Sequence, residues 1–311
     1  MATLQQLGEL EIIRRLCANR AGRPDVLVGA GDDCAVVRTG DPEFDLLLKT
    51  DAVIEGTHFL ADTPPEKIGH KAVGRVVSDF AAMGGEPQHL LIDLVAPGPA
   101  EFDRVAKIYE GAARFGLPII GGGTASGPVL ELHVFGSGRV PRDKALLRSA
   151  ARPGDLVYVT GSFGGSRAGK HLDFEPRLRE GRWLRESGFV HAMIDVSDGL
   201  VTDLRHVAHA SGTGATLMED GIPVSDVARA MKDDRAPIDH ALYDGEDFEL
   251  LFTIAQEEKQ AFEGAWGSAH KLPCTQVGYI TPATGRLTLL TCDGHDVELA
   301  GGGYEHFRAA S

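Results

Sequence analysis

Five short segments of the sequence combine aspartate with glycine, serine or threonine at the end of an apolar stretch. They read GDDCAV, KTDAVIEGTHF, VVSDFAAMGGEP, MIDVSDGL and YDGEDFELLF. Carboxylates gathered at such ends repel one another, and they stay ionised when cations hold them together. Mg²⁺ prefers hard oxygen ligands, and it is typically shared between one or two carboxylates and the phosphates of a substrate. The chemistry that these segments indicate is phosphoryl transfer.

Each of these aspartates also has an ordinary structural explanation. Aspartate caps helices and bonds its own backbone in turns, and Asp198 directly before Gly199 and Leu200 fits an N-cap. The pattern alone does not establish that the five segments meet in space. A metal site and a set of unrelated capping residues are therefore both open at this point.

A second motif has the spacing of a phosphate-binding loop. Residues 164–170 read GGSRAGK, which fits G-x-x-x-x-G-K, and they follow the strand-like stretch LVYVTG. The next residue is His171, where the motif needs a serine or threonine hydroxyl to ligate Mg²⁺. Because this ligand is missing, we interpret the loop as a structural turn.

Composition excludes several classes of protein. The chain has 311 residues and a formal net charge of −14, without a basic run, so nucleic acid is not an expected partner. The four cysteines show no CxxC spacing and are expected to be reduced. No apolar run approaches the roughly 20 residues of a membrane span, and no targeting segment is evident at the N-terminus. We therefore expect a cytoplasmic protein that does not enter a membrane.

Hydrophobic periodicity outlines the elements that must position the acidic segments. Helical spacing predicts helices over about 65–83, 101–115, 177–186, 200–210 and 256–266, the first carrying Asp79 near its C-terminal end. Strand patterns precede or follow most of the acidic segments, and the second half reads as α/β. The charged segment VPRDKALLRSAARPGD contains two prolines, so we place a domain boundary at its start, giving domains 1–138 and 139–311.

Nine motifs in order along the chain resemble the thiamine-monophosphate kinase family, in the superfamily of aminoimidazole ribonucleotide synthetase and selenophosphate synthetase. They are GDDCAVV, TDAVIEGTHF, KAVGRVVSDFAAMGGEP, GGGTASG, LLRSAARPGDLVYVTG, PRLREG, MIDVSDGLVTDL, GEDFELLFT and GGYEHF. One such motif would be a weak signal. Nine in the right order, over nearly the whole chain, are specific.

This resemblance implies an α/β (α+β) fold with two domains and a homodimer. The N-terminal domain would bind ATP and metal and form a barrel with a second copy, and the C-terminal α/β domain would have a mixed sheet. The implied reaction transfers the γ-phosphoryl group of ATP to thiamine monophosphate, with Mg²⁺ as cofactor. An ionised phosphate oxygen is already a nucleophile, so positioning and charge neutralisation suffice and no general base is needed.

The resemblance also implies roles for individual residues. Metal positions are Asp33, Thr50, Asp51, Asp79, Asp195 and Asp198, of which Asp33, Asp79 and Asp198 serve catalysis. The positions for ATP are Gly121, Gly122, Arg148 and Ser197. The positions for the substrate are His58, Glu246 and Tyr304, where Glu246 would pair with a thiazolium and Tyr304 would stack on a ring. Lys49 occupies another metal position, where only its carbonyl is able to act as a ligand.

Two departures from the family pattern leave alternatives open. Gly123 stands where the family usually has a metal-binding aspartate, and Arg75-Val76-Val77 replaces a run that usually contains asparagine. A weakened metal site, or another acidic residue in place of the missing one, would each fit. A protein that binds ATP or thiamine phosphate without turnover is the alternative. A superfamily enzyme with another acceptor is disfavoured, because no reactive thiol lies in a glycine-rich N-terminal loop and Cys34 is expected to be a small buried residue.

Overall fold

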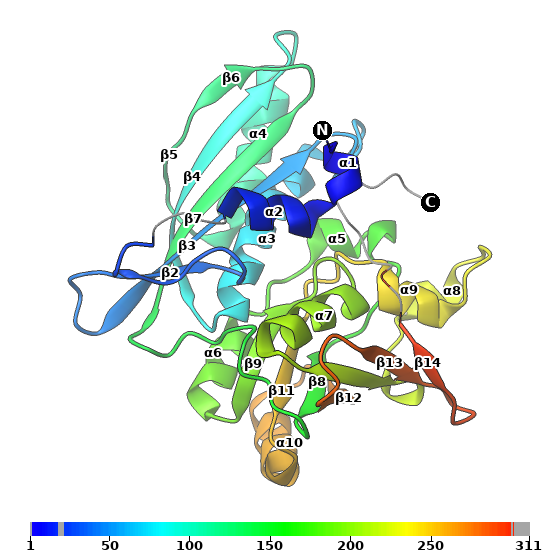
Figure 1. The fold of residues 1–311 in the computed structure, drawn as a ribbon. Helices are drawn as coiled ribbons and strands as arrows, with labels where there is room; N and C mark the ends of the chain where they lie inside the picture. The colour runs from blue at the N-terminus through cyan, green and yellow to red at the C-terminus, as the bar shows by residue number, and fades with distance from the viewer. Residues whose placement is uncertain (1, 18–21, 300, 302–311) are drawn as a thin grey trace.

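The computed structural model of the chain describes residues 2–17, 22–299 and 301. Within these residues the chain folds into two halves, each built on a seven-stranded sheet (Figure 1). The first half occupies the upper part of Figure 1 and the second half the lower part, with helix α3 (Pro65–Ala82) reaching from one towards the other. The prediction of a mixed α/β protein is therefore confirmed.

The first sheet is formed by the strands of the N-terminal half. In chain order these are β1 (Val26–Val28), β2 (Ala35–Arg38), β3 (Phe44–Ile54), β4 (Glu86–Ala96), β5 (Ile119–Gly121), β6 (Thr124–Ser126) and β7 (Glu131–Pro141). Their order across the sheet is β1-β2-β3-β7-β4-β5, and β6 also pairs with β4. The edge strands β1 and β5 do not pair with each other among the described residues, so the sheet of a single chain is open.

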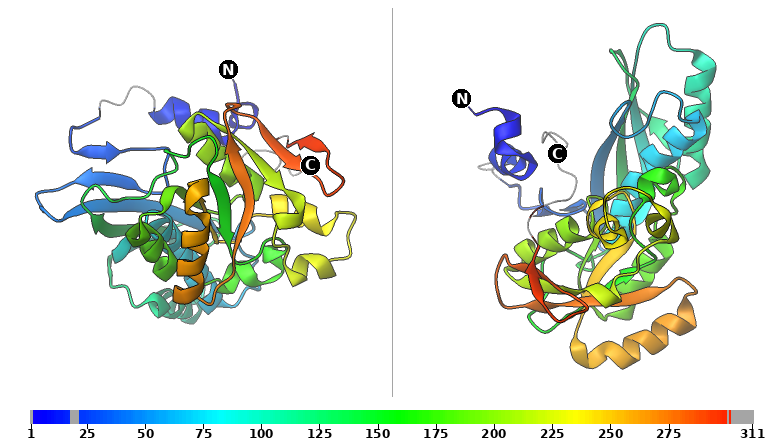
Figure 2. Two further views of the ribbon diagram at one scale, coloured as in Figure 1. Left: turned by 90° about the horizontal axis from the view of Figure 1, so that it is seen from below. Right: turned by 90° about the vertical axis from the view of Figure 1, so that its right-hand side faces the viewer.

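Two long helices pack on one face of this first sheet. Helix α3 and helix α4 (Phe102–Ala112), which a 3-10 turn at Ala113–Phe115 continues, lie together on one side of it, as the right-hand view of Figure 2 shows. Successive side chains of a strand point to opposite faces. In β3, Leu47 and Val53 are buried under the helices, whereas Leu46 and Leu48 are only partly buried on the open face. The short helices α1 (Leu4–Leu7) and α2 (Glu9–Cys17) precede the sheet.

The second half is built on a mixed sheet with helices on both sides. Its strands are β8 (Leu156–Thr160), β9 (Val190–Asp195), β10 (Gly214–Met218), β11 (Leu250–Ile254), β12 (Cys274–Thr281), β13 (Leu287–Leu290) and β14 (Asp296–Glu298), in the order β14-β13-β10-β12-β8-β11-β9. The pair β10 and β13 is parallel and the others are antiparallel. Its helices are α5 (Lys170–Asp173), α6 (Leu178–Ser187), α7 (Leu200–Ser211), α8 (Asp226–Ala230), α9 (Pro237–Tyr243) and α10 (Lys259–Ala269), with 3-10 turns at Ser166–Ala168, Glu219–Gly221 and Gln256–Glu258.

Helix α3 joins the two halves because nearly all of its length is buried. One side packs on the first sheet, and its C-terminal part packs on α6, with Ala81, Ala82 and Leu184 in one apolar cluster. The contact is close: a Cβ atom added to Gly181 of α6 would lie 2.1 Å from the carbonyl oxygen of Ala81. The end of α3 that carries Asp79 therefore lies at the junction of the two halves.

Comparison with the sequence predictions shows where periodicity was sufficient. All five predicted helices are present within a few residues of their expected bounds. Strand β4 was not predicted, because its exposed face carries the polar side chains His89 and Asp93 between apolar ones. The connection 142–155 joins β7 to β8, and β7 extends three residues beyond the proposed boundary at 138. No helix of the described residues is long and apolar enough to cross a membrane.

Candidate active site

Three of the predicted metal-binding aspartates meet at the junction of the halves. Asp33 lies in the turn before β2, Asp79 in the last turn of α3, and Asp195 at the end of β9. Each offers a carboxylate oxygen, and these oxygens lie within 4.8 Å of one another. The three side chains are buried, at 1%, 6% and 4% exposure. The structure thus brings together residues that are separated by more than a hundred positions in the sequence.

The group has the properties of a cation site. Oδ2 of Asp33 is buried and accepts no hydrogen bond within the described part of the chain, although buried polar atoms are normally paired. Burial and the charges of neighbouring carboxylates raise the pKa of Asp79 and of Asp195, although Lys49 acts against this at Asp79. Three carboxylates held this close, one of them with an oxygen that receives no hydrogen bond from the described residues, form a suitable set of oxygen ligands for a divalent cation.

Basic side chains already compensate several of these acids. The guanidinium of Arg148 bonds Oδ1 of Asp33, its Nε at 3.1 Å, and Nζ of Lys49 lies 2.7 Å from Oδ1 of Asp79. Asp195 accepts a hydrogen bond of 2.5 Å from the hydroxyl of Ser78. Two of the three aspartates are therefore paired with a basic side chain. Arg148, which the family resemblance predicts to contact ATP, is one of these basic side chains.

Thr50 and Asp51, two further predicted metal positions, lie outside the group of three. Arg75 binds Asp51 through two hydrogen bonds of 2.9 and 3.1 Å, and the backbone N–H of Ala52 donates to the same carboxylate. Thr50 is exposed and pairs across the sheet with Phe135. The sequence did not reveal that Arg75, one of the departures from the family pattern, binds a proposed metal ligand.

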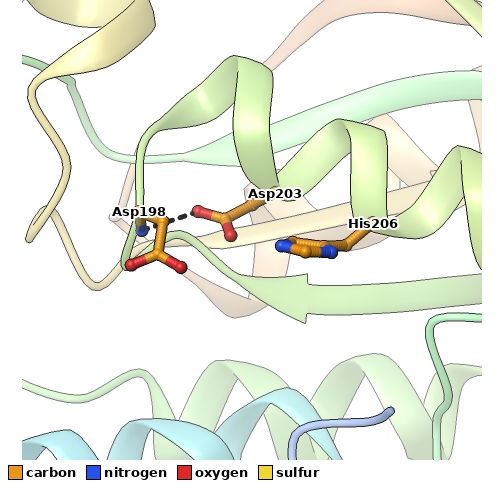
Figure 3. A group of neighbouring side chains, drawn as sticks. All are labelled: Asp198, Asp203 and His206. Carbon is orange, nitrogen blue, oxygen red and sulfur yellow. Dashed lines mark hydrogen bonds between the residues drawn. The ribbon is translucent and has the colours of Figure 1, made fainter. Parts of the chain in front are cut away.

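A second cluster contains Asp198 with two residues that the sequence reading did not select. Asp198, Asp203 and His206 offer ligand atoms within 4.8 Å of one another, and Figure 3 shows their side chains along the N-terminal part of α7. Oδ2 of Asp203 accepts hydrogen bonds of 3.0 Å from the backbone N–H groups of both Ser197 and Asp198. Burial and the charge of Arg148 lower the pKa of His206 to about 4, so the imidazole is neutral.

These contacts correct the simple capping explanation for Asp198. The N-cap residue of α7 is Gly199, which has no side chain to act as a cap. Asp203, in the first turn of α7, instead accepts hydrogen bonds from the backbone N–H groups of Ser197 and Asp198. Asp203 is only 2% exposed. The signal for this role was an aspartate in the first turn of a predicted helix, where acidic side chains are favoured. The side chain of Asp198 is consequently not needed to begin the helix.

The glycine turn predicted to approach ATP lies at the edge of the first sheet. Gly121 ends β5, and Gly122 has a φ of +151°. A Cβ atom on Gly122 would lie 1.9 Å from the carbonyl oxygen of Ile92, so only glycine fits against β4. All of Gly121, Gly122 and Gly123 are exposed, and none belongs to the acidic group.

Another carboxylate lies beside Gly123, the position where the family usually has an aspartate. Oδ1 of Asp93, on β4, would lie 2.9 Å from a Cβ atom added to Gly123. Asp93 is exposed, on the face of β4 opposite to buried Ile92. The chain therefore carries a carboxylate beside the turn even though the turn itself has lost one.

The predicted substrate side is a network of charged groups. Oε1 of Glu246 lies 2.5 Å from Nζ of Lys71, and Oε2 lies 3.1 Å from Nδ1 of His171. Burial acts to raise the pKa of Glu246, but hydrogen bonds and charges from His171 and Lys71 hold it at about 2. Lys71 also donates to the carbonyl oxygen of His58 at 2.7 Å. The charge of Glu246 is thus compensated within the chain itself.

His58 and Tyr304 have different outcomes. His58 is 7% exposed, and its Nδ1 accepts the backbone N–H of Ile54 at 3.1 Å. Burial, Arg75 and Lys71 lower its pKa to about 4. This bond fixes the ring in the turn after β3, close to Lys71 and hence to Glu246. Tyr304 lies outside the described residues, and its proposed role in stacking stays a prediction.

The phosphate-loop look-alike is occupied by the protein's own carboxylates. The backbone N–H of Gly164 donates to Asp247 at 3.2 Å, and that of Gly165 to Asp244 at 2.9 Å. Nζ of Lys170 donates to the carbonyl oxygen of Ser162 and to Glu249 at 3.1 Å. These donors are the ones that a Walker loop offers to phosphate. The loop therefore holds the segment 244–249, in agreement with its interpretation as a structural turn.

Substitution of Lys170 separates the two interpretations of this loop. We expect Lys170→Met to lower the free energy of unfolding by roughly 1–3 kcal/mol, because buried Glu249 loses an ionic partner, while the KM for ATP changes less than about twofold. Urea unfolding and steady-state kinetics measure the two quantities. The matched control is Lys259→Met, which removes a more exposed lysine bonded to Gln276 on β12. A rise of the KM for ATP by tenfold or more, in Lys170→Met alone, would restore the phosphate-loop reading.

Comparisons with known proteins bear on the whole chain. The AIR synthase related protein family matches with its N-terminal domain at residues 31–140 and its C-terminal domain at residues 152–289. The thiamine-monophosphate kinase of Salmonella typhimurium is 35% identical, over 96% of this chain and 98% of its own length. The chain belongs to the thiamine-monophosphate kinase family. The family member from Bacillus subtilis is 31% identical, over 97% of this chain and 100% of its own length.

Solved structures support the same membership in the thiamine-monophosphate kinase family. AaThiL complexed with AMPPCP and TMP superposes with a TM-score of 0.82 at 30% identity, covering 98% of this chain and 99% of the other. Thiamine-monophosphate kinase from Stenotrophomonas maltophilia has a TM-score of 0.73 at 30% identity, with coverage of 93% and 96%. The family resemblance drawn from the nine motifs is confirmed.

Proposed function

We propose that this chain is an ATP-dependent thiamine-monophosphate kinase of the cytoplasm, which forms thiamine diphosphate by direct in-line transfer. The observation that carries the proposal is the buried group of Asp33, Asp79 and Asp195 at the junction of the two halves, where one oxygen of Asp33 accepts no hydrogen bond from the described residues. Family membership and the relative that was solved with an ATP analogue and TMP support the choice of substrates.

The residues of the site suit a reaction without a general base. The attacking atom is an oxygen of the monophosphate, which is ionised near neutral pH and needs no proton removed. Asp33, Asp79 and Asp195 would hold Mg²⁺, which neutralises the negative charge of the phosphates when it is bound. The guanidinium of Arg148, fixed by Asp33, has further N–H groups with which to orient a phosphate of ATP. Asp198 and Ser197, fixed through their backbones by Asp203, complete this side of the site.

Two features support activity despite the departures from the family pattern. Asp93 supplies a carboxylate where Gly123 has none. The open face of the first sheet carries partly exposed apolar side chains, among them Leu48, Leu91 and Phe135, that a second copy would cover to form a barrel. The proposal therefore includes a homodimer through domain 1–138, with domain 139–311 on the outside.

The function is tested by steady-state formation of thiamine diphosphate from ATP and thiamine monophosphate during a Mg²⁺ titration. We expect turnover that saturates with Mg²⁺ and is absent in EDTA. Binding of ATP and thiamine monophosphate without product at saturating Mg²⁺ would reject the kinase and favour a binding protein. Phosphorylation of a different acceptor at a higher kcat/KM would assign the chain to another branch of the superfamily.

A further inference from the structure

Basic side chains balance the acids on one side of the site. Lys49 and Asp51 lie two residues apart, and therefore on one face of β3, while Arg75 and Asp79 lie four residues apart on one face of α3. The two faces meet as crossed ion pairs, Lys49 with Asp79 at 2.7 Å and Arg75 with Asp51 at 2.9 Å. This set of four, the Lys49–Arg75 quartet, carries no net charge.

The quartet is enclosed. The exposed fractions of its side chains are 23% for Lys49, 15% for Arg75, 24% for Asp51 and 8% for Asp79. Lys49 and Arg75 therefore place two basic groups where the carboxylates of Asp51 and Asp79 would otherwise attract a cation.

The other side of the site is left short of positive charge. Asp33 is bonded by Arg148, while Asp195 accepts a hydrogen bond from Ser78 and has no basic partner at ion-pair distance among the described residues. Four carboxylates, Asp33, Asp51, Asp79 and Asp195, thus face three basic side chains, Lys49, Arg75 and Arg148, which leaves one negative charge uncompensated. Oδ2 of Asp33 has no hydrogen-bond partner among the described residues, and Asp33 and Asp195 both lie outside the quartet.

We propose that Lys49 and Arg75 are built-in cations that take the place of a divalent ion at Asp51 and Asp79. Metal binding at this junction is then confined to Asp33, Asp195 and the second oxygen of Asp79. The identity of the ion as Mg²⁺ rests on the proposed function, but the exclusion of an ion from the quartet rests only on the ion pairs. One arrangement thus explains the arginine at 75, which departs from the family pattern, and the lysine at 49, whose ammonium is not able to ligate a metal ion.

The test counts bound Mn²⁺ per chain, by electron paramagnetic resonance and calorimetry, with neither nucleotide nor thiamine monophosphate present. We expect Lys49→Met to bind one Mn²⁺ more per chain than the wild type, because Asp79 then loses its counter-charge and only Arg75 remains to balance the two carboxylates of Asp51 and Asp79. Lys49→Arg keeps the charge and is expected to bind the wild-type number. The matched control Lys67→Met breaks an exposed ion pair with Asp173 on the same helix and is also expected to leave the number unchanged.

A wild-type or lower Mn²⁺ count in folded Lys49→Met would overturn the proposal. If Lys49→Met folds only when Mn²⁺ is added, that dependence supports it, because the ion then replaces the ammonium. If the variant does not fold in either condition, Arg75→Gln provides the same test at Asp51: one additional Mn²⁺ supports the proposal and an unchanged count rejects it.

The experiment is independent of catalysis. An additional Mn²⁺ in Lys49→Met, together with no thiamine diphosphate formed by the wild type, would retain the built-in cations and reject the kinase. An unchanged Mn²⁺ count in Lys49→Met, together with thiamine diphosphate formed by the wild type, would reject the built-in cations and retain the kinase. The two proposals therefore fail separately.

Discussion

Replacement of Asp195 by asparagine is expected to lower kcat for thiamine diphosphate formation by about 10²–10³-fold, the usual effect of removing one charge-stabilising group from an active site. The same change should stabilise the metal-free protein by on the order of 1–2 kcal/mol, since it removes a buried carboxylate that has no basic partner at ion-pair distance in the described part of the chain. The amide oxygen of asparagine still accepts the hydroxyl of Ser78, so the packing is retained. Residues of an active site often lower the stability of the folded protein while they are required for the reaction. Asp195 is expected to behave in this way.

Kinetics at saturating Mg²⁺ and thermal unfolding with and without EDTA measure these two effects. In the wild type, Mg²⁺ should raise the unfolding temperature, because it binds only the folded state, and in Asp195→Asn this rise should be much smaller. Asp155→Asn is the matched control, since Asp155 is equally buried but is bonded to His191 outside the site. The control should lose stability and keep kcat within about threefold. Full activity in Asp195→Asn would exclude Asp195 as a metal ligand.

Gly181→Ala is expected to lower both stability and kcat, although Gly181 lies outside the acidic group. A Cβ atom at this position would lie 2.1 Å from the carbonyl oxygen of Ala81, so helices α3 and α6 must move apart. Overpacking of this kind costs about 1–3 kcal/mol, which outweighs the gain of about 1 kcal/mol from replacing glycine in a helix. Because Ala81 is two residues from Asp79, kcat should fall as well, by about tenfold or more.

The control for this prediction is another glycine in a helix. A Cβ atom added to Gly264, in α10, meets no heavy atom within 4 Å, so Gly264→Ala should gain about 0.5–1 kcal/mol and leave kcat unchanged. Urea unfolding and steady-state assays of both variants give the comparison. Equal changes in the free energy of unfolding for Gly181→Ala and Gly264→Ala would show that helices α3 and α6 accommodate the added methyl group without cost. The contact between these helices would then not be what positions Asp79.

Local pattern was sufficient wherever one element decides its own conformation. Helix α3 was predicted because Ile68, Ala72, Val73, Val76 and Phe80 recur at helical spacing, and the structure buries all of them. Strand β4 was missed because its alternation places the polar residues His89 and Asp93 on the exposed face of the sheet, between apolar ones. The buried position of Cys34 was also predicted correctly.

The sequence did not predict which side chains form ion pairs and hydrogen bonds with the acidic residues. Asp33, Asp79 and Asp195 could be chosen as candidates from their motifs, but their convergence depends on how α3 packs between two sheets. Arg75 was read as a departure from the family pattern and Lys49 as a metal position acting through its carbonyl, and only their contacts with Asp51 and Asp79 showed that they are counter-ions. Asp203 and His206 were passed over because a single residue in a helix gives no sign of its neighbours.

By itself the sequence determined the family, the class of chemistry and the main helices, because motifs and periodicity are properties of short stretches of chain. The tertiary structure alone decided which charges meet. The glycine loop at 164–170 binds carboxylates of the segment 244–249, Asp51 is held by Arg75, and one oxygen of Asp33 has no donor among the residues that the structure describes. The physical reason is that electrostatic interaction depends on distance and burial in space, and both are set by packing between elements far apart in the chain.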